Sequence, residues 1–280
     1  MFTTTANGIP VSGFGLYALG PDIAIRAVSS ALEAGYRHID TAQSYGNEAA
    51  CGEAIAGSGL PREEVFVTTK VTPRNLAPGR MLPSVRESCE NLRLDMIDLV
   101  LIHYPYPWDL IPMETYLEQL GELHEAGVAR MVGVSNFTIA QMDLAEKMLG
   151  KGGVATNQVE IHVFHQNRPV VEHCRRLGIP ATAYCALARG NLFGSPKERL
   201  GPHPTLVEIA AKHSATVAQI GLSFLLHEGH VTLSTTIDTD QISSNLKARE
   251  LALDDEDMYR LRAMDMRKRI VDTPYFPIFD

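Results

Sequence analysis

Residues 97–103 read Ile-Asp-Leu-Val-Leu-Ile-His, an apolar run broken only by Asp98 and closed by a histidine. A strand that is apolar along almost its whole length is typical of a parallel sheet, in which both faces are buried. Amphipathic patterns typical of helices stand on both sides of it, at residues 79–92 and 115–125. The stretch therefore predicts one strand of an alternating β/α fold.

The same alternation continues in both directions along the chain. The other short apolar runs predict strands at Phe14–Leu16, Tyr36–Ile39, Val65–Thr69, Arg130–Val134, Ala155–Val159, Ala181–Tyr184 and Val231–Leu233. The remaining helical patterns lie at Ile23–Glu33, Ala49–Ala56, Ile139–Leu149, Pro169–Leu177, Pro204–His213 and Val217–His227. No linker and no shift in composition interrupts them.

Eight β/α units within 280 residues predict a (β/α)8 TIM barrel, formed as a single domain over residues 1–280. The pair Asn7-Gly8 between short strand-like pieces predicts a short N-terminal hairpin in front of the barrel. A doubly wound sheet is the alternative. It would require a glycine-rich turn after the first strand, and Gly13-Phe14-Gly15 does not continue as Gly-x-Gly-x-x-Gly.

Composition and charge exclude several classes of protein. With 45% hydrophobic residues the chain can bury a large core, and its net charge of −8 argues against a nucleic-acid partner. No apolar run approaches ~18 residues, and the first residues have no signal-peptide pattern, so no membrane association is expected. The four cysteines form no Cys-x-x-Cys pair and are expected as reduced thiols. These features predict a cytoplasmic enzyme.

Polar side chains close the predicted strands. In a β/α barrel the carboxyl ends of the strands meet at one mouth, where the chemistry takes place. The residues at these ends are Asp40, Lys70, His103, Ser135, Asn136, Gln158, Glu160 and Tyr184. Each of them alone could be a solvated strand end or a cap. Asp40, Lys70 and His103 follow one another on three adjacent strands, and this favours a catalytic site.

Tyr45 lies five residues after Asp40, in the loop that leaves the second strand. A tyrosine, with a pKa near ~10, is a weak acid at neutral pH. We expect the Lys70 ammonium, itself held by Asp40, to lower the pKa of Tyr45 and make it a proton donor. His103 is expected to orient a carbonyl oxygen beside Tyr45.

Glu160, His162 and His165 also suggest a metal site, but their spacing provides no clear third ligand, and no metal is expected.

Several motifs together resemble the aldo-keto reductase family. They occur in the family's order and span about residues 8–265. The motifs are Asp40-Thr41-Ala42, Tyr45-Gly46-Asn47-Glu48, Thr68-Thr69-Lys70, Asp98-Leu99 with Ile102-His103, and Gly133-Val134-Ser135-Asn136-Phe137. The compact length, Ala42-Gln43, residues 156–160 and residues 245–248 resemble most the bacterial subgroup of the 2,5-diketo-D-gluconate reductase B type.

The resemblance implies an oxidoreductase that reduces an aldehyde or a ketone to an alcohol by hydride transfer from NADPH or NADH. The catalytic tetrad would be Asp40, Tyr45, Lys70 and His103, with Tyr45 as the general acid. The residues implied at the cofactor are Ser135, Asn136 and Gln158 at the nicotinamide carboxamide, Tyr184 stacked on its ring, and Leu187. The substrate, a small carbonyl compound, would contact Tyr17, Tyr104 and Trp108. Relatives are mostly monomers, so a monomer is expected.

One segment departs from the family pattern. After the eighth strand, relatives typically carry a lysine, a serine and then an arginine that hold the adenosine 2′-phosphate. Aligned on Asn245, this sequence has Thr235, Thr236 and Gln241 at those three positions. With both cations missing, we predict that NADH is used at least as well as NADPH. Arg249 is a cation nearby in the sequence that could substitute for them.

Two other functions remain as alternatives. A catalytically inactive nucleotide-binding module of the same fold would require loss of the tetrad, which is intact here. A phosphate-handling barrel isomerase or lyase would require a glycine-rich anion site after the seventh and eighth strands. Gly190 is present there, but a Gly-x-Gly pattern is not.

Overall fold

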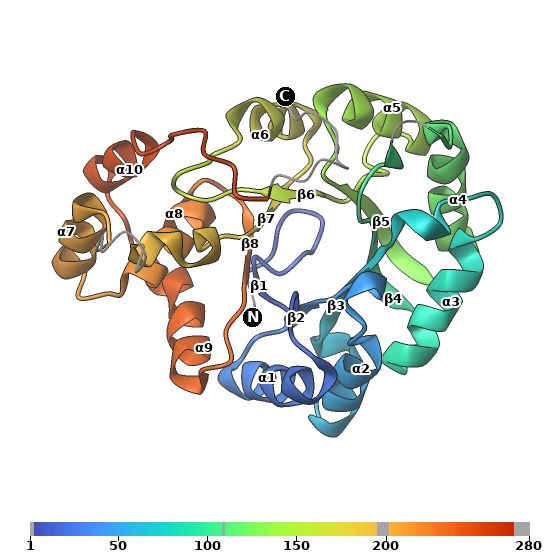
Figure 1. The fold of residues 1–280 in the computed structure, drawn as a ribbon, viewed down its shortest axis with the longest axis horizontal. Coiled ribbons are helices and arrows are strands. Elements are labelled where there is room, and N and C mark those ends of the chain that lie inside the picture. Colours follow the sequence, from blue (N-terminus) through green and yellow to red (C-terminus); the bar gives the residue numbers. More distant parts are fainter. Residues whose placement is uncertain (1–2, 108–109, 195–201, 272–280) are drawn as a thin grey trace.

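The computed structural model describes residues 3–107, 110–194 and 202–271. Eight parallel strands form a closed barrel in the order in which they occur along the chain. The strands are β1 (Ser12–Gly15), β2 (His38–Asp40), β3 (Phe66–Val71), β4 (Ile97–Ile102), β5 (Ala129–Ser135), β6 (Asn157–Glu160), β7 (Ala181–Tyr184) and β8 (Val231–Ser234). Figure 1 shows these strands as a ring with helices outside it. The predicted (β/α)8 barrel is confirmed.

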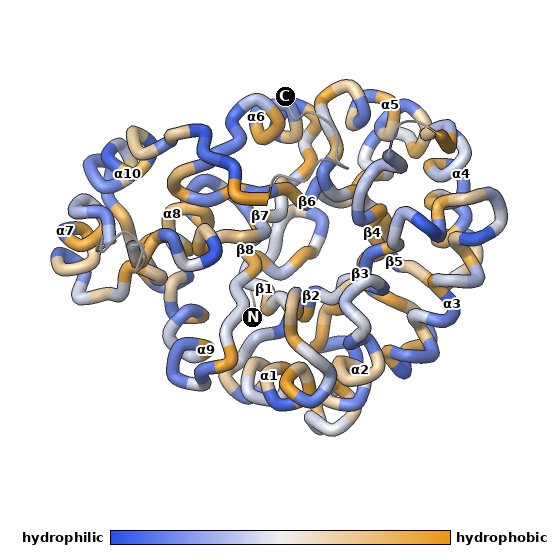
Figure 2. The backbone as a smooth tube through the Cα atoms, viewed as in Figure 1, coloured by the Kyte–Doolittle hydropathy of each residue, from blue (hydrophilic) through white to orange (hydrophobic). Residues whose placement is uncertain are grey.

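Ten α-helices lie in the described part of the chain. They are α1 (Pro21–Ala34), α2 (Glu48–Gly57), α3 (Met81–Leu92), α4 (Met113–Glu125), α5 (Ile139–Leu149), α6 (Arg168–Leu177), α7 (Pro204–Lys212), α8 (Val217–His227), α9 (Thr239–Leu246) and α10 (Asp255–Arg262). In Figure 2 the surrounding helices carry both hydrophobic and hydrophilic positions, as expected for helices that pack one face on a barrel.

The structure differs from the sequence prediction at a few elements. Helices α9 and α10 were not predicted, because each is only eight residues long and too polar for a clear apolar period. They are specified instead by their caps: Asp238 accepts a hydrogen bond from Gln241 N, and Asp254 accepts one from Asp257 N. Strand β1 begins at Ser12 rather than Phe14, since Ser12 and Gly13 pair with β8.

The predicted N-terminal hairpin is confirmed. It closes the end of the barrel at which the strands begin. Thr4 and Pro10 pair in antiparallel fashion, and Gly8 takes a positive φ of 89° at the turn. The side chain of Asn7 donates to the carbonyl oxygen of Ala155 at 2.8 Å. Ile9 packs inside the barrel among apolar side chains of β3, β4 and β8 and of the residues just before β6: Phe66, Leu99, Leu101, Ala155 and Val231. This end is sealed, so the opposite, C-terminal end is the open one.

Candidate active site

A cavity of about 920 Å³ lies at the C-terminal end of the barrel. Its wall includes most of the residues that the sequence suggested for the site. These are Tyr17, Asp40, Tyr45, His103, Tyr104, Ser135, Asn136, Gln158, Tyr184, Leu187, Thr235, Thr236, Gln241 and Asn245. Lys70 is buried beneath the wall, with 1% of its surface exposed. Trp108, expected at the substrate, lies outside the described residues.

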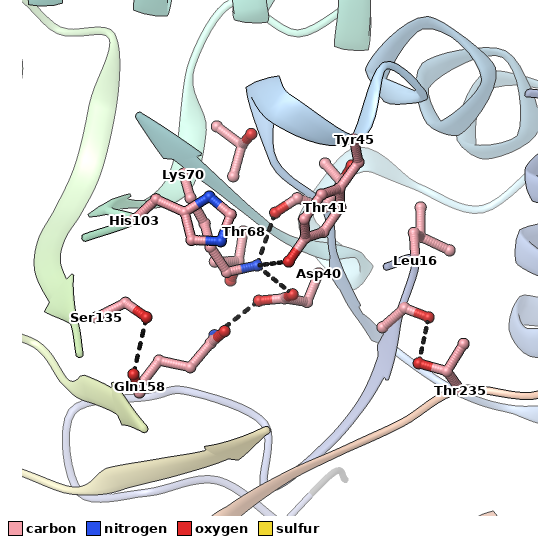
Figure 3. Close-up of polar contacts among 12 residues, drawn as sticks. Leu16, Asp40, Thr41, Tyr45, Thr68, Lys70, His103, Ser135, Gln158 and Thr235 are labelled. Atoms are coloured by element: carbon pink, nitrogen blue, oxygen red, sulfur yellow. Dashed lines mark hydrogen bonds and ion pairs between the residues drawn. The ribbon is translucent and has the colours of Figure 1, made fainter. Parts of the chain in front are cut away.

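Lys70 and Asp40 form a buried ion pair at the ends of β3 and β2. The Lys70 ammonium donates to Asp40 Oδ1 at 2.5 Å and to the Thr41 carbonyl oxygen at 2.9 Å (Figure 3). The other carboxylate oxygen of Asp40 accepts a hydrogen bond from Gln158 Nε2 at 2.8 Å. A buried charge is costly unless it is paired and hydrogen-bonded, and here both charges meet that condition.

Tyr45 is brought to the same ammonium by a short 3-10 helix, Gln43–Tyr45, and by the turn after it. Gly46 takes a φ of 68°, a left-handed conformation that glycine adopts without strain. The third contact of Lys70 Nζ is with the Tyr45 hydroxyl, at 3.4 Å. The structure thus joins Asp40, Lys70 and Tyr45 in one chain of polar contacts.

The expectation that Lys70 lowers the pKa of Tyr45 is wrong for the protein without bound molecules. Burial, followed by the charge of Asp40, raises the pKa of Tyr45 well above its ordinary value. The physical reason is first that burial penalises the charged phenolate, and second that Asp40, 2.5 Å from Lys70, offsets the positive charge that would stabilise it. Tyr45 is therefore a protonated phenol, which is the form a proton donor needs.

His103 follows β4 and is neutral. Burial, with a smaller contribution from the Lys70 charge, lowers its pKa to about 3. Its ring lies 5.6 Å from the Tyr45 ring and stacks on Tyr104 at 4.9 Å between centroids. Ser44 Oγ lies 3.3 Å from Nδ1, so a hydrogen bond donated by Ser44 would leave the ring proton on Nε2.

The polar side chains at the ends of β5, β6 and β7 form one network. Asn136, held at a positive φ of 62°, donates to the His103 carbonyl oxygen and to Ser135 Oγ, both at 3.0 Å. Its Oδ1 accepts a hydrogen bond from the Tyr184 hydroxyl at 2.7 Å. Ser135 Oγ donates to the Gln158 carbonyl oxygen at 2.8 Å. These contacts fix the amide group of Asn136 at the cavity wall, while the amide group of Gln158 is held by its hydrogen bond to Asp40.

The segment from β8 into α9 forms another part of the wall. The Thr235 hydroxyl donates to the Gly15 carbonyl oxygen at 2.9 Å, and the Thr236 hydroxyl donates to Gln241 Oε1 at 3.0 Å. Among the described residues of the cavity wall, Arg189 is the only lysine or arginine. Arg249 is not on that wall and lies instead in a separate hollow with Thr3 and Gly35.

Sequence reasoning missed several residues of the cavity wall. Phe193, in the loop after β7, and Ile270 and Val271, far along the chain, all line it, beside Arg189 of the same loop. The Arg189 guanidinium lies over the Tyr17 ring at 5.4 Å. Nothing in the local pattern around these residues marks them as part of a site. Only the glycine and arginine of the loop after β7 could have drawn attention to it.

The alternative of a metal site finds no counterpart in the described part of the chain. Glu160 and His162 do meet, at 3.0 Å between Oε1 and Nε2, but no group of three or more potential ligands that could hold a metal occurs there. Across the same ranges, no helix is both long and apolar enough to span a membrane.

The fold and the site together define a class of enzyme. A neutral phenol and a neutral imidazole face one large cavity at the mouth of a TIM barrel, and a buried lysine–carboxylate pair lies next to the phenol. These groups suit chemistry on a polarised oxygen, in which a proton is donated and negative charge is stabilised. The arrangement is therefore suited to a barrel enzyme that acts on carbonyl groups.

Comparisons with known proteins identify the family. The profile of the Aldo/keto reductase family matches residues 13–266. The methylglyoxal reductase DkgB of Escherichia coli O157:H7 is 42% identical over 263 residues, which are 94% of this chain and 96% of that protein. The chain belongs to the aldo-keto reductase family.

Comparison with solved structures leads to the same family. A crystal structure described provisionally as a 2,5-diketo-D-gluconic acid reductase B has a TM-score of 0.93 at 36% identity, covering 100% of this chain and 98% of that one. The Bombyx mori aldo-keto reductase AKR2E4 in complex with NADP has a TM-score of 0.87 at 30% identity, covering 96% and 94% of the two chains. The chain is thus an NAD(P)H-dependent reductase of carbonyl compounds, and no comparison supports an inactive module.

Proposed function

We propose that Tyr45 donates the proton to a carbonyl oxygen bound in the cavity. The observation that carries this proposal is the Lys70 ammonium between the Asp40 carboxylate and the Tyr45 hydroxyl, at 2.5 and 3.4 Å. As the phenol gives up its proton, negative charge develops beside the ammonium, and Lys70 stabilises it. The Nε2–H of neutral His103 polarises the same carbonyl oxygen.

The cavity fits a nicotinamide nucleotide in size and in its polar groups. Its volume lies within the usual range for small-molecule sites, roughly 300–1,000 Å³. Gln158 Oε1 and the second lone pair of Asn136 Oδ1 remain available to accept hydrogen bonds from a carboxamide. We propose that they do so together with Ser135, while the Tyr184 ring supports the nicotinamide ring and Leu187 contacts the nucleotide. When bound, the nucleotide supplies the hydride that reduces the carbonyl carbon.

We further propose that Thr235, Thr236, Gln241 and Asn245 hold the adenosine ribose without a 2′-phosphate. Charge-assisted hydrogen bonds to a phosphate are worth roughly 1.5–3 kcal/mol each, so each missing cation costs about 10- to 100-fold in affinity. Both hydroxyl protons of the two threonines are already donated, to Gly15 and to Gln241. The only cation of the described wall, Arg189, is engaged over Tyr17. This proposal departs from the relative crystallised with NADP.

We expect kcat/KM for NADH to be at least equal to that for NADPH with one good aldehyde. Replacing Thr235→Lys together with Gln241→Arg is expected to shift the ratio toward NADPH by about tenfold or more, through the restored charge-assisted bonds. The matched control, Thr235→Met with Gln241→Met, has similar side-chain lengths without charge and should leave the ratio unchanged. A tenfold or greater wild-type preference for NADPH would contradict the proposal.

Small aldehydes and ketones are the proposed substrates, and they contact Tyr17, Tyr104 and Trp108. Methylglyoxal is the first compound to test, because the relatives at 39–42% identity are named methylglyoxal reductases. The test follows carbonyl-dependent oxidation of NADH and of NADPH with methylglyoxal, an aldose and an aromatic aldehyde. Saturable turnover of any of them is expected. Failure with every carbonyl would refute the proposed function.

We also propose that the chain works as a monomer in the cytoplasm, with residues 1–280 as one domain. Support comes from the cavity, whose polar network is complete within one chain, and from four cysteines that are all free thiols. Sedimentation at several protein concentrations tests the oligomeric state.

A further inference from the structure

The segment that follows α10 returns to the mouth of the barrel. Figure 1 shows it running back from α10 toward β7 and β6. The backbone N–H groups of Met266 and Lys268 both donate to the Phe164 carbonyl oxygen at 3.1 Å. Further along, Ile270 and Val271 form part of the cavity wall. The segment therefore contributes directly to the space that a substrate and a nucleotide occupy.

The last two described residues of this segment, Ile270 and Val271, are held by one carboxylate. Glu160, at the end of β6, has no exposed surface. Its Oε1 accepts a hydrogen bond from Ile270 N at 2.6 Å, and its Oε2 accepts one from Val271 N at 2.8 Å. The remaining contact is His162 Nε2, 3.0 Å from Oε1. Each carboxylate oxygen thus binds one of two consecutive backbone N–H groups.

This arrangement provides hydrogen-bond partners for the Glu160 carboxylate and for both backbone N–H groups. It also fixes the backbone at two adjacent residues. A buried carboxylate without hydrogen bonds would be costly, and hydrogen bonds to a charged acceptor are stronger than those to a neutral one. Burial raises the pKa of Glu160, but the hydrogen bonds from His162, Ile270 and Val271 outweigh that effect and bring the pKa below its usual value. The carboxylate is therefore ionised while it holds the segment.

The wall that Glu160 fixes lies on the aromatic side of the cavity. Glu160 and Tyr184 are register partners on β6 and β7. Burial raises the pKa of Tyr184 well above its ordinary value, and Tyr104, Glu160 and Arg269 are near enough to influence it as well. Tyr104 is one of the proposed substrate contacts. Ile270 and Val271, which Glu160 holds, line the same cavity as Tyr104 and so limit the room for the non-reacting part of a bulky carbonyl compound.

We propose that Glu160 is a positioning residue that determines substrate specificity by holding Ile270 and Val271 against the cavity. This inference rests on the proposed carbonyl reduction and adds a residue that sets its size selectivity. Glu160 is not required for docking α10 itself, because other contacts do that. Gln166 Nε2 donates to the Leu261 and Arg262 carbonyl oxygens, and Arg168 Nε donates to Asp265 Oδ2.

The substitution Glu160→Gln tests the anchor directly. The amide has the same shape, but it is uncharged, and its NH2 group faces one of the two backbone N–H groups instead of accepting from it. We expect hydrogen–deuterium exchange at residues 270–271 to become faster. For a bulky aromatic aldehyde KM should rise by up to about tenfold, because reordering the loosened segment around the substrate costs at most the one lost charge-assisted hydrogen bond, with little change for a small aldehyde. Nucleotide affinity and kcat for the small aldehyde should stay near the wild-type values.

A control and a double variant separate positioning from general damage. Asp265→Asn alters a carboxylate that holds the same segment five residues earlier, and it should leave the KM ratio of the two aldehydes unchanged. Ile270→Ala should raise KM for the bulky aldehyde in the wild-type protein but add little in the Glu160→Gln protein, because the two residues act through one contact.

Different experimental results would refute this inference and the proposed function. Unchanged exchange at residues 270–271 in Glu160→Gln overturns the anchor whatever the activity. A KM increase that is equal for both aldehydes, or fully additive effects of Glu160→Gln and Ile270→Ala, overturns the role in specificity. Absence of wild-type turnover with every carbonyl refutes the proposed function and leaves the exchange experiment to decide on the anchor.

Discussion

Replacing Tyr45 by phenylalanine is expected to lower kcat at least ~100-fold, which is the usual size of a general-acid contribution. The variant keeps the ring, which lies 5.4 Å from the Tyr17 ring and 5.6 Å from the His103 ring, and loses only the hydroxyl. That hydroxyl is the protic group next to the Lys70 ammonium at the cavity wall. Steady-state kinetics with a saturating aldehyde measure the loss, and fluorescence titration should show nearly unchanged nucleotide affinity.

Tyr17→Phe is the matched control for this experiment. It removes a phenolic hydroxyl from the same cavity wall, on a ring that packs edge-on against Tyr45, but it does not remove the contact with Lys70. Its kcat should stay close to the wild-type value. If Tyr45→Phe retains more than about a tenth of the wild-type kcat, the assignment of the general acid is wrong.

The second large effect concerns stability. Asp40→Asn or Lys70→Met alone is expected to lower the free energy of unfolding by about 3–5 kcal/mol, because either change leaves the other charge buried without its partner. Lys70 is 1% exposed and Asp40 is 3% exposed, so a charge left without its partner would be poorly hydrated. Thr41, Tyr45 and Gln158 offer only neutral contacts. Chemical denaturation without nucleotide measures the change.

The double variant Asp40→Asn with Lys70→Met tests whether the loss comes from the uncompensated charge. It contains neither charge and should be less destabilised than either single variant, since replacing both partners of a buried pair is often close to neutral. Losses that simply add would show instead that the two side chains stabilise the barrel independently. All three variants should lack catalysis, because the Lys70–Tyr45 contact requires the ion pair.

The convergence of Asp40, Lys70 and His103 was predictable because it obeys a rule of the fold. Asp40, Lys70 and His103 stand at or directly after the ends of β2, β3 and β4, and in a closed parallel barrel those ends meet. Their convergence then follows from strand order, without knowledge of any side-chain conformation. The eight strands were recognisable for the same reason, since short apolar runs alternate with amphipathic helices.

The protonation of Tyr45 could not be predicted from its neighbours in the sequence. A lysine near a tyrosine favours the phenolate, but the outcome depends on burial and on where the counter-charge lies. Lys70 Nζ lies 2.5 Å from the Asp40 carboxylate and 3.4 Å from the Tyr45 hydroxyl. The negative charge of Asp40 therefore offsets most of the effect that the positive charge of Lys70 would have on Tyr45. Distances of this kind exist only in the folded protein.

The amino-acid sequence by itself determined the barrel, the family and the polar residues at the strand ends, because these depend on local periodicity and on fixed positions along the chain. Only the tertiary structure decided how Glu160 meets Ile270 and Val271, some 110 residues away, and how Arg189 lies over Tyr17. Those contacts use backbone N–H groups and loops, which carry no side-chain pattern. They arise only when barrel closure brings distant segments to one mouth.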